Sequence, residues 1–170
     1  MKRAVVFLLL ACAPVAPAQS LLGPAPLSFR LQDISPRTAT RHAVVLELHF
    51  RNTSQQSFRL MSAASGVSYE QGVSLLNLLT ISLKQKGAAY IILAGPTKID
   101  YGPGAVFQYV TILPGKSYRV VLPISKLLDA KAIPFPAGDY TVKMSYHNQA
   151  GEHCIKGVYP SNDLRLTVRR

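Results

Sequence analysis

The sequence predicts an all-β fold, a Greek-key sandwich of about seven to nine antiparallel strands. Three observations support this prediction. Apolar and polar residues alternate with a period of two in many short runs, turn-forming residues separate the runs, and no segment carries the apolar stripe of a long amphipathic helix. Such alternation is typical of antiparallel sheets that bury one face and expose the other. A small closed barrel is the alternative architecture.

The alternation is clearest in runs that we expect to form one strand each. In one of them Val44, Leu46, Leu48 and Phe50 alternate with their neighbours, so the four side chains share a face. The runs lie at residues 27–32, 44–51, 79–84, 118–122, 140–147 and 164–169.

Turn signals separate these runs. Asn52-Thr53-Ser54 ends the second one, and Pro114-Gly115 predicts a tight hairpin between residues 110–113 and 118–122. Two stretches do not alternate. We expect residues 61–78 to form a long loop with a helical turn, and residues 125–133 to form one short helical turn.

The first 18 residues resemble a secretory signal peptide. Lys2 and Arg3 precede an apolar run at residues 4–11, and Ala16-Pro17-Ala18 has the small-x-small pattern of a cleavage site. The apolar run is shorter than the roughly 20 residues of a membrane-spanning helix. We therefore expect an exported chain, periplasmic or secreted, with a flexible lead-in at residues 19–26 and one domain at residues 27–170.

A second cleavage site remains open. Leu9-Leu10-Ala11-Cys12 resembles the lipobox of bacterial lipoproteins, in which the cysteine is lipidated and becomes the first residue. In that case the domain is anchored to the envelope through Cys12. If Cys12 is removed instead, Cys154 is the sole remaining cysteine and no intrachain disulfide forms.

The chain is basic, with a formal net charge of +11 and a pI near 10.0. Its lysines and arginines are scattered among apolar residues, as on solvated strand faces. Export and the absence of a basic run or recognition motif disfavour a nucleic-acid ligand. The charge favours acidic proteins, anionic glycans or anionic membrane surfaces as partners.

Three short motifs resemble those of bacterial exported immunoglobulin-like β-sandwich domains. Residues 137–142 (AGDYTV) are similar to the strand start that carries the tyrosine corner, residues 109–117 (YVTILPGKS) to the preceding hairpin, and residues 48–54 (LHFRNTS) to a strand end. The resemblance implies that the Tyr140 phenol bonds back to the backbone. Families that share these motifs include proteinase-inhibitor-like domains and the accessory β-domain of some secreted metalloproteases.

The motifs of common enzymes are absent. The four histidines form no H-E-x-x-H, and no G-x-S-x-G occurs. We therefore predict no catalytic residues and no cofactor. Met144, His147, His153 and Cys154 are close in sequence, and the last three are the candidate ligands of an alternative metal site. Met144 is in phase with Val142, so we expect it in the core.

The leading hypothesis is a non-catalytic binding module that acts through end loops and a basic surface, as a proteinase inhibitor or an envelope-associated protein. Its candidate contact residues are Tyr90, Lys98 and Tyr101, in a stretch rich in aromatic residues, glycine and proline. An exposed edge strand could also accept a partner's strand. The alternative is a small metal- or ligand-binding periplasmic protein that uses residues 147–154. The sequence does not fix the oligomeric state.

Overall fold

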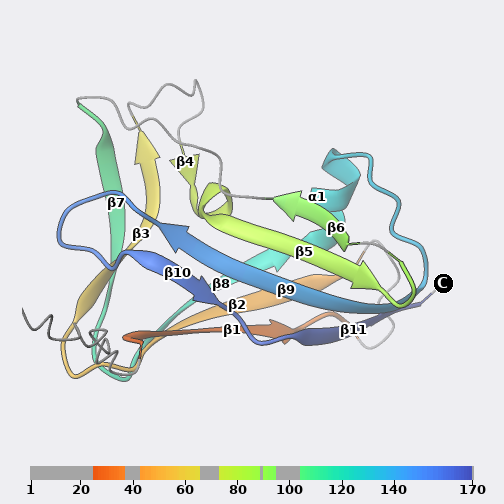
Figure 1. Cartoon of the computed structure of the whole chain (residues 1–170), viewed down its shortest axis with the longest axis horizontal. Helices are drawn as coiled ribbons and strands as arrows, with labels where there is room; N and C mark the ends of the chain where they lie inside the picture. The colour runs from red at the N-terminus through yellow and green to blue at the C-terminus, as the bar shows by residue number, and fades with distance from the viewer. Residues whose placement is uncertain (1–24, 37–42, 66–72, 89, 95–103, 170) are drawn as a thin grey trace, which may run out of the picture.

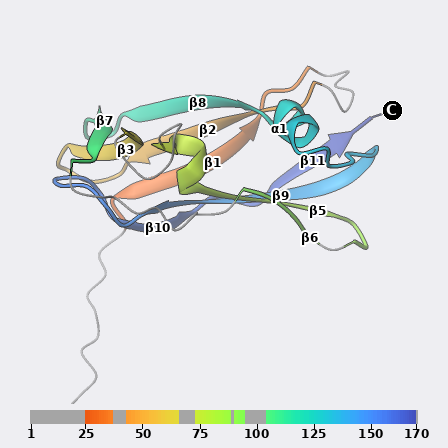
Figure 2. The same cartoon turned by 90° about the horizontal axis from the view of Figure 1, so that it is seen from above.

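A computed structural model of the chain describes residues 25–36, 43–65, 73–88, 90–94 and 104–169. The expected export signal and Cys12 lie outside these residues. The described residues form a two-layer β-sandwich with a short arm at one end (Figures 1 and 2).

The described part of the chain contains eleven strand segments and two short helices. The strands are β1 (Leu27–Asp33), β2 (Val45–Asn52), β3 (Phe58–Ser65), β4 (Val73–Ser74), β5 (Leu79–Gln85), β6 (Tyr90–Ala94), β7 (Val106–Ile112), β8 (Ser117–Pro123), β9 (Gly138–Asn148), β10 (Gly157–Pro160) and β11 (Leu164–Val168). The helices are the 3-10 helix η1 (Leu75–Leu78) and the α-helix α1 (Ile124–Ala130), and neither is long and apolar enough to span a membrane.

Every strand pair is antiparallel, as the alternation predicted. One layer has the order β1-β2-β8. The facing layer has the order β10-β9-β5-β6, and β11 pairs with the part of β9 that β10 leaves free. The arm has the order β4-β3-β7 and lies at the opposite end from α1 (Figure 1).

The strand order is that of an immunoglobulin-like Greek key. In that fold strands A, B and E form one sheet, and C, F and G form the other. Here β1, β2 and β8 take the first three places, and β5, β9 and β11 take the others. The predicted fold class is therefore confirmed.

The core lies between the two layers and is made by the alternating residues that the sequence placed there. Leu46, Leu48 and Phe50 of β2 are fully buried, with 0% exposure. The Phe50 ring stacks on Phe29 of β1 at 4.6 Å between centroids and meets Tyr146 of β9 edge-on at 5.7 Å. The contact between Phe50 and Tyr146 joins the two layers without a disulfide.

The turn predicted at Pro114-Gly115 is present, but the prediction that it joins two strands of one hairpin is wrong. The Lys116 N–H donates to Leu113 O over 3.0 Å, and Gly115 has the positive φ of 70° that suits glycine in such a turn. The flanking strands β7 and β8, however, pair with β3 and β2 in different sheets. The turn closes on Asn52 instead: Gly115 N–H donates to Asn52 O (3.0 Å), and Asn52 N–H donates to Lys116 O (2.9 Å).

Asn52 holds the corner at which the β2–β8 pair gives way to the β3–β7 pair. Its buried side-chain amide donates to Gln56 O and Ile112 O, each over 2.8 Å. Its Oδ1 accepts from the N–H and the hydroxyl of Ser54, each also over 2.8 Å. The amide thus satisfies every bond it can make, and it ties both strand pairs to one point.

The prediction of a loop at residues 61–78 is wrong for its first part, because the strand β3 occupies residues 58–65. Its sequence, FRLMSAAS, has small residues and no clean alternation, since a bulge interrupts the register between Met61 and Ala63. The helical turn expected in that stretch is present as η1, and the one expected at residues 125–133 is present as α1.

The hydrogen bond that the resemblance implied for Tyr140 is present. Its hydroxyl donates to Pro136 O over 2.7 Å, and Phe135 packs against its ring at 4.8 Å between centroids. Burial raises the pKa of the Tyr140 phenol above its usual value. The corner thereby fixes the start of β9, the central strand of its layer.

Two residues between β10 and β11 tie the layers together at one edge. Asn162 binds both backbone groups of Leu31 on the outer edge of β1, accepting its N–H at Oδ1 (2.8 Å) and donating to its O (3.3 Å). Ser161 holds Met144 of β9 in the same way, through Ser161 N–H to Met144 O (2.8 Å) and Met144 N–H to Ser161 Oγ (3.1 Å). We call this side of the sandwich the bridged edge.

Candidate functional site

An open depression of about 820 Å³ lies on the outer face of β5, β9 and β11. The strand register sets its floor: Lys84, Thr141 and Arg165 are direct neighbours across the three strands. Lys86 directly follows the end of β5, Lys143 lies two residues beyond Thr141 on β9, and all four cationic side chains are exposed. We call this surface the basic depression.

Two carboxylates also line the basic depression, and both have partners. Asp163 forms an ion pair with Lys143, with 2.9 Å between Oδ2 and Nζ. Asp139 Oδ1 accepts a hydrogen bond from the Thr167 hydroxyl over 2.7 Å. These pairs are exposed and add little stability, but they occupy the two anionic groups.

Lys86 and Arg165 form no ion pair with any residue that the structure describes. Their charges are therefore available to an anionic ligand, and the outward-facing residues Thr141 and Thr167 lie beside them. The guanidinium of Arg165 can donate two parallel hydrogen bonds to a carboxylate or sulfate, whereas Lys86 acts as a point charge. Hydroxyl groups next to these two cations suit a ligand that carries both charge and hydroxyls.

Gly138, the first residue of β9, lies close to the Gln85 side chain at the end of β5. Its φ is 153°, and a Cβ at this position would lie 2.6 Å from Gln85 Nε2. A larger residue would therefore displace the Gln85 side chain, which is in phase with the inward residues Ile81 and Leu83 of β5.

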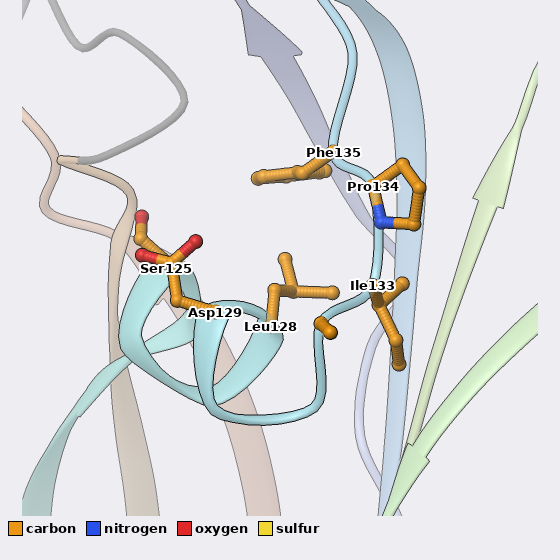
Figure 3. A pocket seen from close by; sticks show the side chains of 7 residues that line it. Ser125, Leu128, Asp129, Ile133, Pro134 and Phe135 are labelled. Atoms are coloured by element: carbon orange, nitrogen blue, oxygen red, sulfur yellow. The ribbon is translucent and has the colours of Figure 1, made fainter.

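A second, smaller pocket of about 200 Å³ lies between α1 and residues 132–135 (Figure 3). Ser125 and Asp129 line its helix side, and Phe135 and Pro134 face them. A nucleophilic serine needs a base within hydrogen-bond reach. The Ser125 hydroxyl instead binds the backbone of Val44, accepting its N–H (2.9 Å) and donating to its O (3.4 Å). We assign this serine a structural role.

The candidate metal ligands point to different places. His147 lies on the outer face of β9, where its Nε2 contacts Thr80 Oγ1 over 2.9 Å and burial lowers its pKa. The Cys154 thiol contacts the Asn148 amide and Ala150 O, each over 3.3 Å. Met144 is in the core at 2% exposure, as predicted. Within the described ranges no three His, Cys, Asp or Glu side chains are grouped closely enough to hold a metal ion.

His153 stands apart from this group in one respect. It is exposed and has a positive φ of 54° in the turn after β9. This conformation is uncommon for residues other than glycine, although histidine tolerates it better than most. Among the described residues, His147, His153 and Cys154 do not form a ligand cluster.

The predicted contact residues fall mostly outside the structure's described ranges. Tyr90 opens β6 and pairs with Lys84 of β5. Lys98 and Tyr101 lie outside the described residues. Phe107 and Tyr109, the other aromatic residues of that stretch, belong to β7 and pack against the core.

Sequence reasoning missed the residues of the basic depression. Lys84, Lys86, Lys143 and Arg165 come from three separated strands and read as scattered charges. A signal was present, because Lys84, Lys143 and Arg165 each occupy a polar position of an alternating run, and Lys86 follows Lys84 in the same phase. Only the pairing of β5, β9 and β11 shows that these positions are adjacent.

Comparison with models of known protein families and with curated proteins found no match to this chain.

Proposed function

We propose that the chain is a non-catalytic, extracytoplasmic binding module that holds an anionic glycan in the basic depression. The observation that carries the proposal is the pair of cations without an ion-pair partner among the described residues, Lys86 and Arg165, set beside the hydroxyls of Thr141 and Thr167. Charges attract the acidic groups of such a ligand, and hydroxyl and amide groups bind its sugar hydroxyls.

The shape of the basic depression supports an extended ligand. Its volume of about 820 Å³ exceeds what one small anion needs, and it lies open along the outer face of a sheet. Small-molecule sites, in contrast, usually enclose most of the ligand surface. A polymer that lies across β5, β9 and β11 can contact several rows of side chains at once.

The test is retention on a sulfated glycan, with heparin as the probe. Replacing Lys86 and Arg165 together by alanine removes two charges from the basic depression, and we expect roughly tenfold weaker binding at ~0.1 M salt. The matched control replaces Arg30 and Arg51 by alanine. Both are exposed on the outer face of the other layer, and neither forms an ion pair with a described residue. It removes the same net charge from the opposite side of the sandwich.

The outcomes separate a defined site from general basicity. Strong weakening by the first double variant and weak effect of the control support the site. Equal weakening by both variants would show that heparin responds to net charge alone, and the proposal would be withdrawn. A preference for an acidic peptide over heparin, lost in the first variant only, would replace the glycan with a protein ligand.

Export is part of the proposal and has its own test. The sequence supports it through the apolar run at residues 4–11 and Ala16-Pro17-Ala18. Mass spectrometry of the chain from a bacterial envelope fraction should give a chain that starts at Gln19 or at a lipidated Cys12. A full-length chain that starts at Met1 and stays in the cytoplasm would contradict export.

A further inference from the structure

The second edge of the β1-β2-β8 layer exposes backbone groups of β8. Asn52 lies opposite Lys116, and its N–H donates to Lys116 O (2.9 Å), so this pair occupies a hydrogen-bonding position of the antiparallel ladder. Hydrogen-bonded and non-hydrogen-bonded pairs alternate along such a ladder, so the next pair, Arg51–Ser117, shares no hydrogen bonds. The bonds to β2 then fall on the alternate residues of β8, starting at Tyr118. The N–H and C=O groups of Ser117, Arg119 and Val121 therefore point away from β2. We call this row the open edge.

The open edge has no hydrogen-bond partner in the described part of the chain. β8 pairs with β2 alone, and no backbone or side-chain hydrogen bond joins Ser117, Arg119 or Val121 to another described element. Val121 is 58% exposed. The register with β2 is regular over its whole length, so no bulge turns the edge away from a partner.

The inner face of β8 is also less covered than that of its neighbour. Tyr118, Val120 and Leu122 point inward but remain half-buried, whereas the inward residues of β2 are fully buried. The facing layer is four strands wide, since β10 and β11 share one side of β9, and the β1-β2-β8 layer is three strands wide. A strand added beside β8 would equalise the layers and cover these three side chains.

The charges on the outer face of the β1-β2-β8 layer indicate which side chains an added strand should carry. Arg30, His49 and Arg119 are direct neighbours across β1, β2 and β8. The carboxylate of Glu47, on β2, contacts His49. No described residue forms an ion pair with Arg119. An acidic side chain opposite Arg119 would form a favourable cross-strand pair.

We infer that the open edge binds an extended segment of a partner protein by strand addition. The segment carries an acidic residue opposite Arg119 on its outer face and apolar residues over Tyr118, Val120 and Leu122 on its inner face. A second copy of this chain fits poorly. Antiparallel self-pairing about the middle of β8 would place Arg119 opposite or diagonal to its own copy, and like charges there are destabilising.

The first measurement is amide hydrogen exchange on the full chain without a partner. We expect the Arg119 and Val121 amides to exchange far faster than those of Val120 and Leu122, which bond to β2. Protection of all four amides to the same degree would mean that another part of the chain covers the edge, and the inference would fall.

The second measurement is binding of a synthetic peptide of about nine residues, in which threonine alternates with valine around a central glutamate on the threonine face. We expect it to protect the Arg119 and Val121 amides. Replacing the central glutamate by lysine should weaken binding by about threefold. The Arg119→Glu variant should reverse this preference.

A proline at the open edge provides the blocking variant. Val121→Pro removes an N–H that does not bond to β2, so the strand itself should remain folded. We expect loss of peptide binding with an unchanged far-UV circular dichroism spectrum, and Val121→Thr is the matched control. If the proline unfolds β8, the peptide preference of the Arg119→Glu variant still tests the inference.

Three results would overturn the inference. They are peptide binding that survives Val121→Pro in a folded chain, a charge preference that Arg119→Glu leaves unchanged, and a concentration-dependent dimer that Val121→Pro abolishes. The last result would assign the edge to a second copy. None of these measurements involves the basic depression, which lies on the other layer, so the two proposals fail independently.

Discussion

The two edges of the β1-β2-β8 layer show how one sheet can be closed on one side and open on the other. At the bridged edge, the Asn162 amide binds both backbone groups of Leu31, and Ser161 binds those of Met144. At the open edge, β8 has a regular register and no described partner. The difference lies in two short polar side chains, placed where β10 ends and β11 begins.

This comparison shows that edge protection in this fold is local. Sheet edges invite pairing with other chains, and proteins commonly blunt them with charges, bulges or covering segments. Here the residues between β10 and β11 cover the outer edge of β1. On the other side Arg119 supplies a charge, and no described strand pairs with the outer backbone groups of β8.

The largest expected effect tests the corner from which the open edge starts. Asn52→Ala removes four side-chain hydrogen bonds from a fully buried position, and we expect a loss of about 3 kcal/mol in the free energy of unfolding. Urea titration measures this loss. Gln55→Ala, at an exposed neighbour without such bonds, is the control and should change it by less than about 0.5 kcal/mol. Equal effects would show that Asn52 is not the anchor.

Breaking the bridged edge should make it resemble the open one. Asn162→Ala removes both bonds to Leu31, and we expect a loss of about 1 to 2 kcal/mol together with faster exchange of the Leu31 amide. Asn162→Asp keeps the acceptor and should retain part of the protection. Exchange at Arg119 should not change, and a change there would mean that the two edges are coupled.

The start of β9 supports the bridged side and allows a smaller test. Tyr140→Phe removes the hydrogen bond to Pro136 O, and we expect a loss of about 1 kcal/mol. Tyr118→Phe, on β8, removes a hydroxyl that makes no hydrogen bond to any described residue and should be close to neutral. Thermal unfolding of both variants gives the comparison. A Tyr118 effect as large as that of Tyr140 would contradict the special role of the corner.

The smallest effect is a pH dependence at His147, on the bridged side between β5 and β10. Burial lowers its folded pKa below the unfolded value of 6.5, so the unfolded state binds the proton more readily. Its contribution is complete above pH 6.5 and is lost as pH falls through the folded pKa. Because the ring is partly solvated, we expect only a fraction of a kcal/mol.

The measurement for His147 is the change in Tm between pH 7.5 and pH 5. The wild type should lose more stability over this range than His147→Gln, which has no titrating ring. His153→Gln is the control and should follow the wild type. A His147→Gln variant with the same pH profile as the wild type would show that this histidine does not contribute.

Much of the fold could be predicted because it depends on local pattern. Alternation placed Leu46, Leu48 and Phe50 in the core, and all three are fully buried. The turn at Pro114-Gly115 followed from residues that favour that backbone conformation. The strand β3 was missed because its bulge and small residues hide the period.

The sequence by itself determined the all-β class, the inward face of each alternating strand and the corner formed by Tyr140, since each depends on residues within one segment. Only the tertiary structure decided that β7 and β8 enter different sheets, that Lys86 and Arg165 share a depression, and that Asn162 bridges one edge while β8 remains open. These features depend on which distant strands pair. Alternation with a period of two tells which face of the sheet a side chain occupies, but it carries no information about which strand lies next to it.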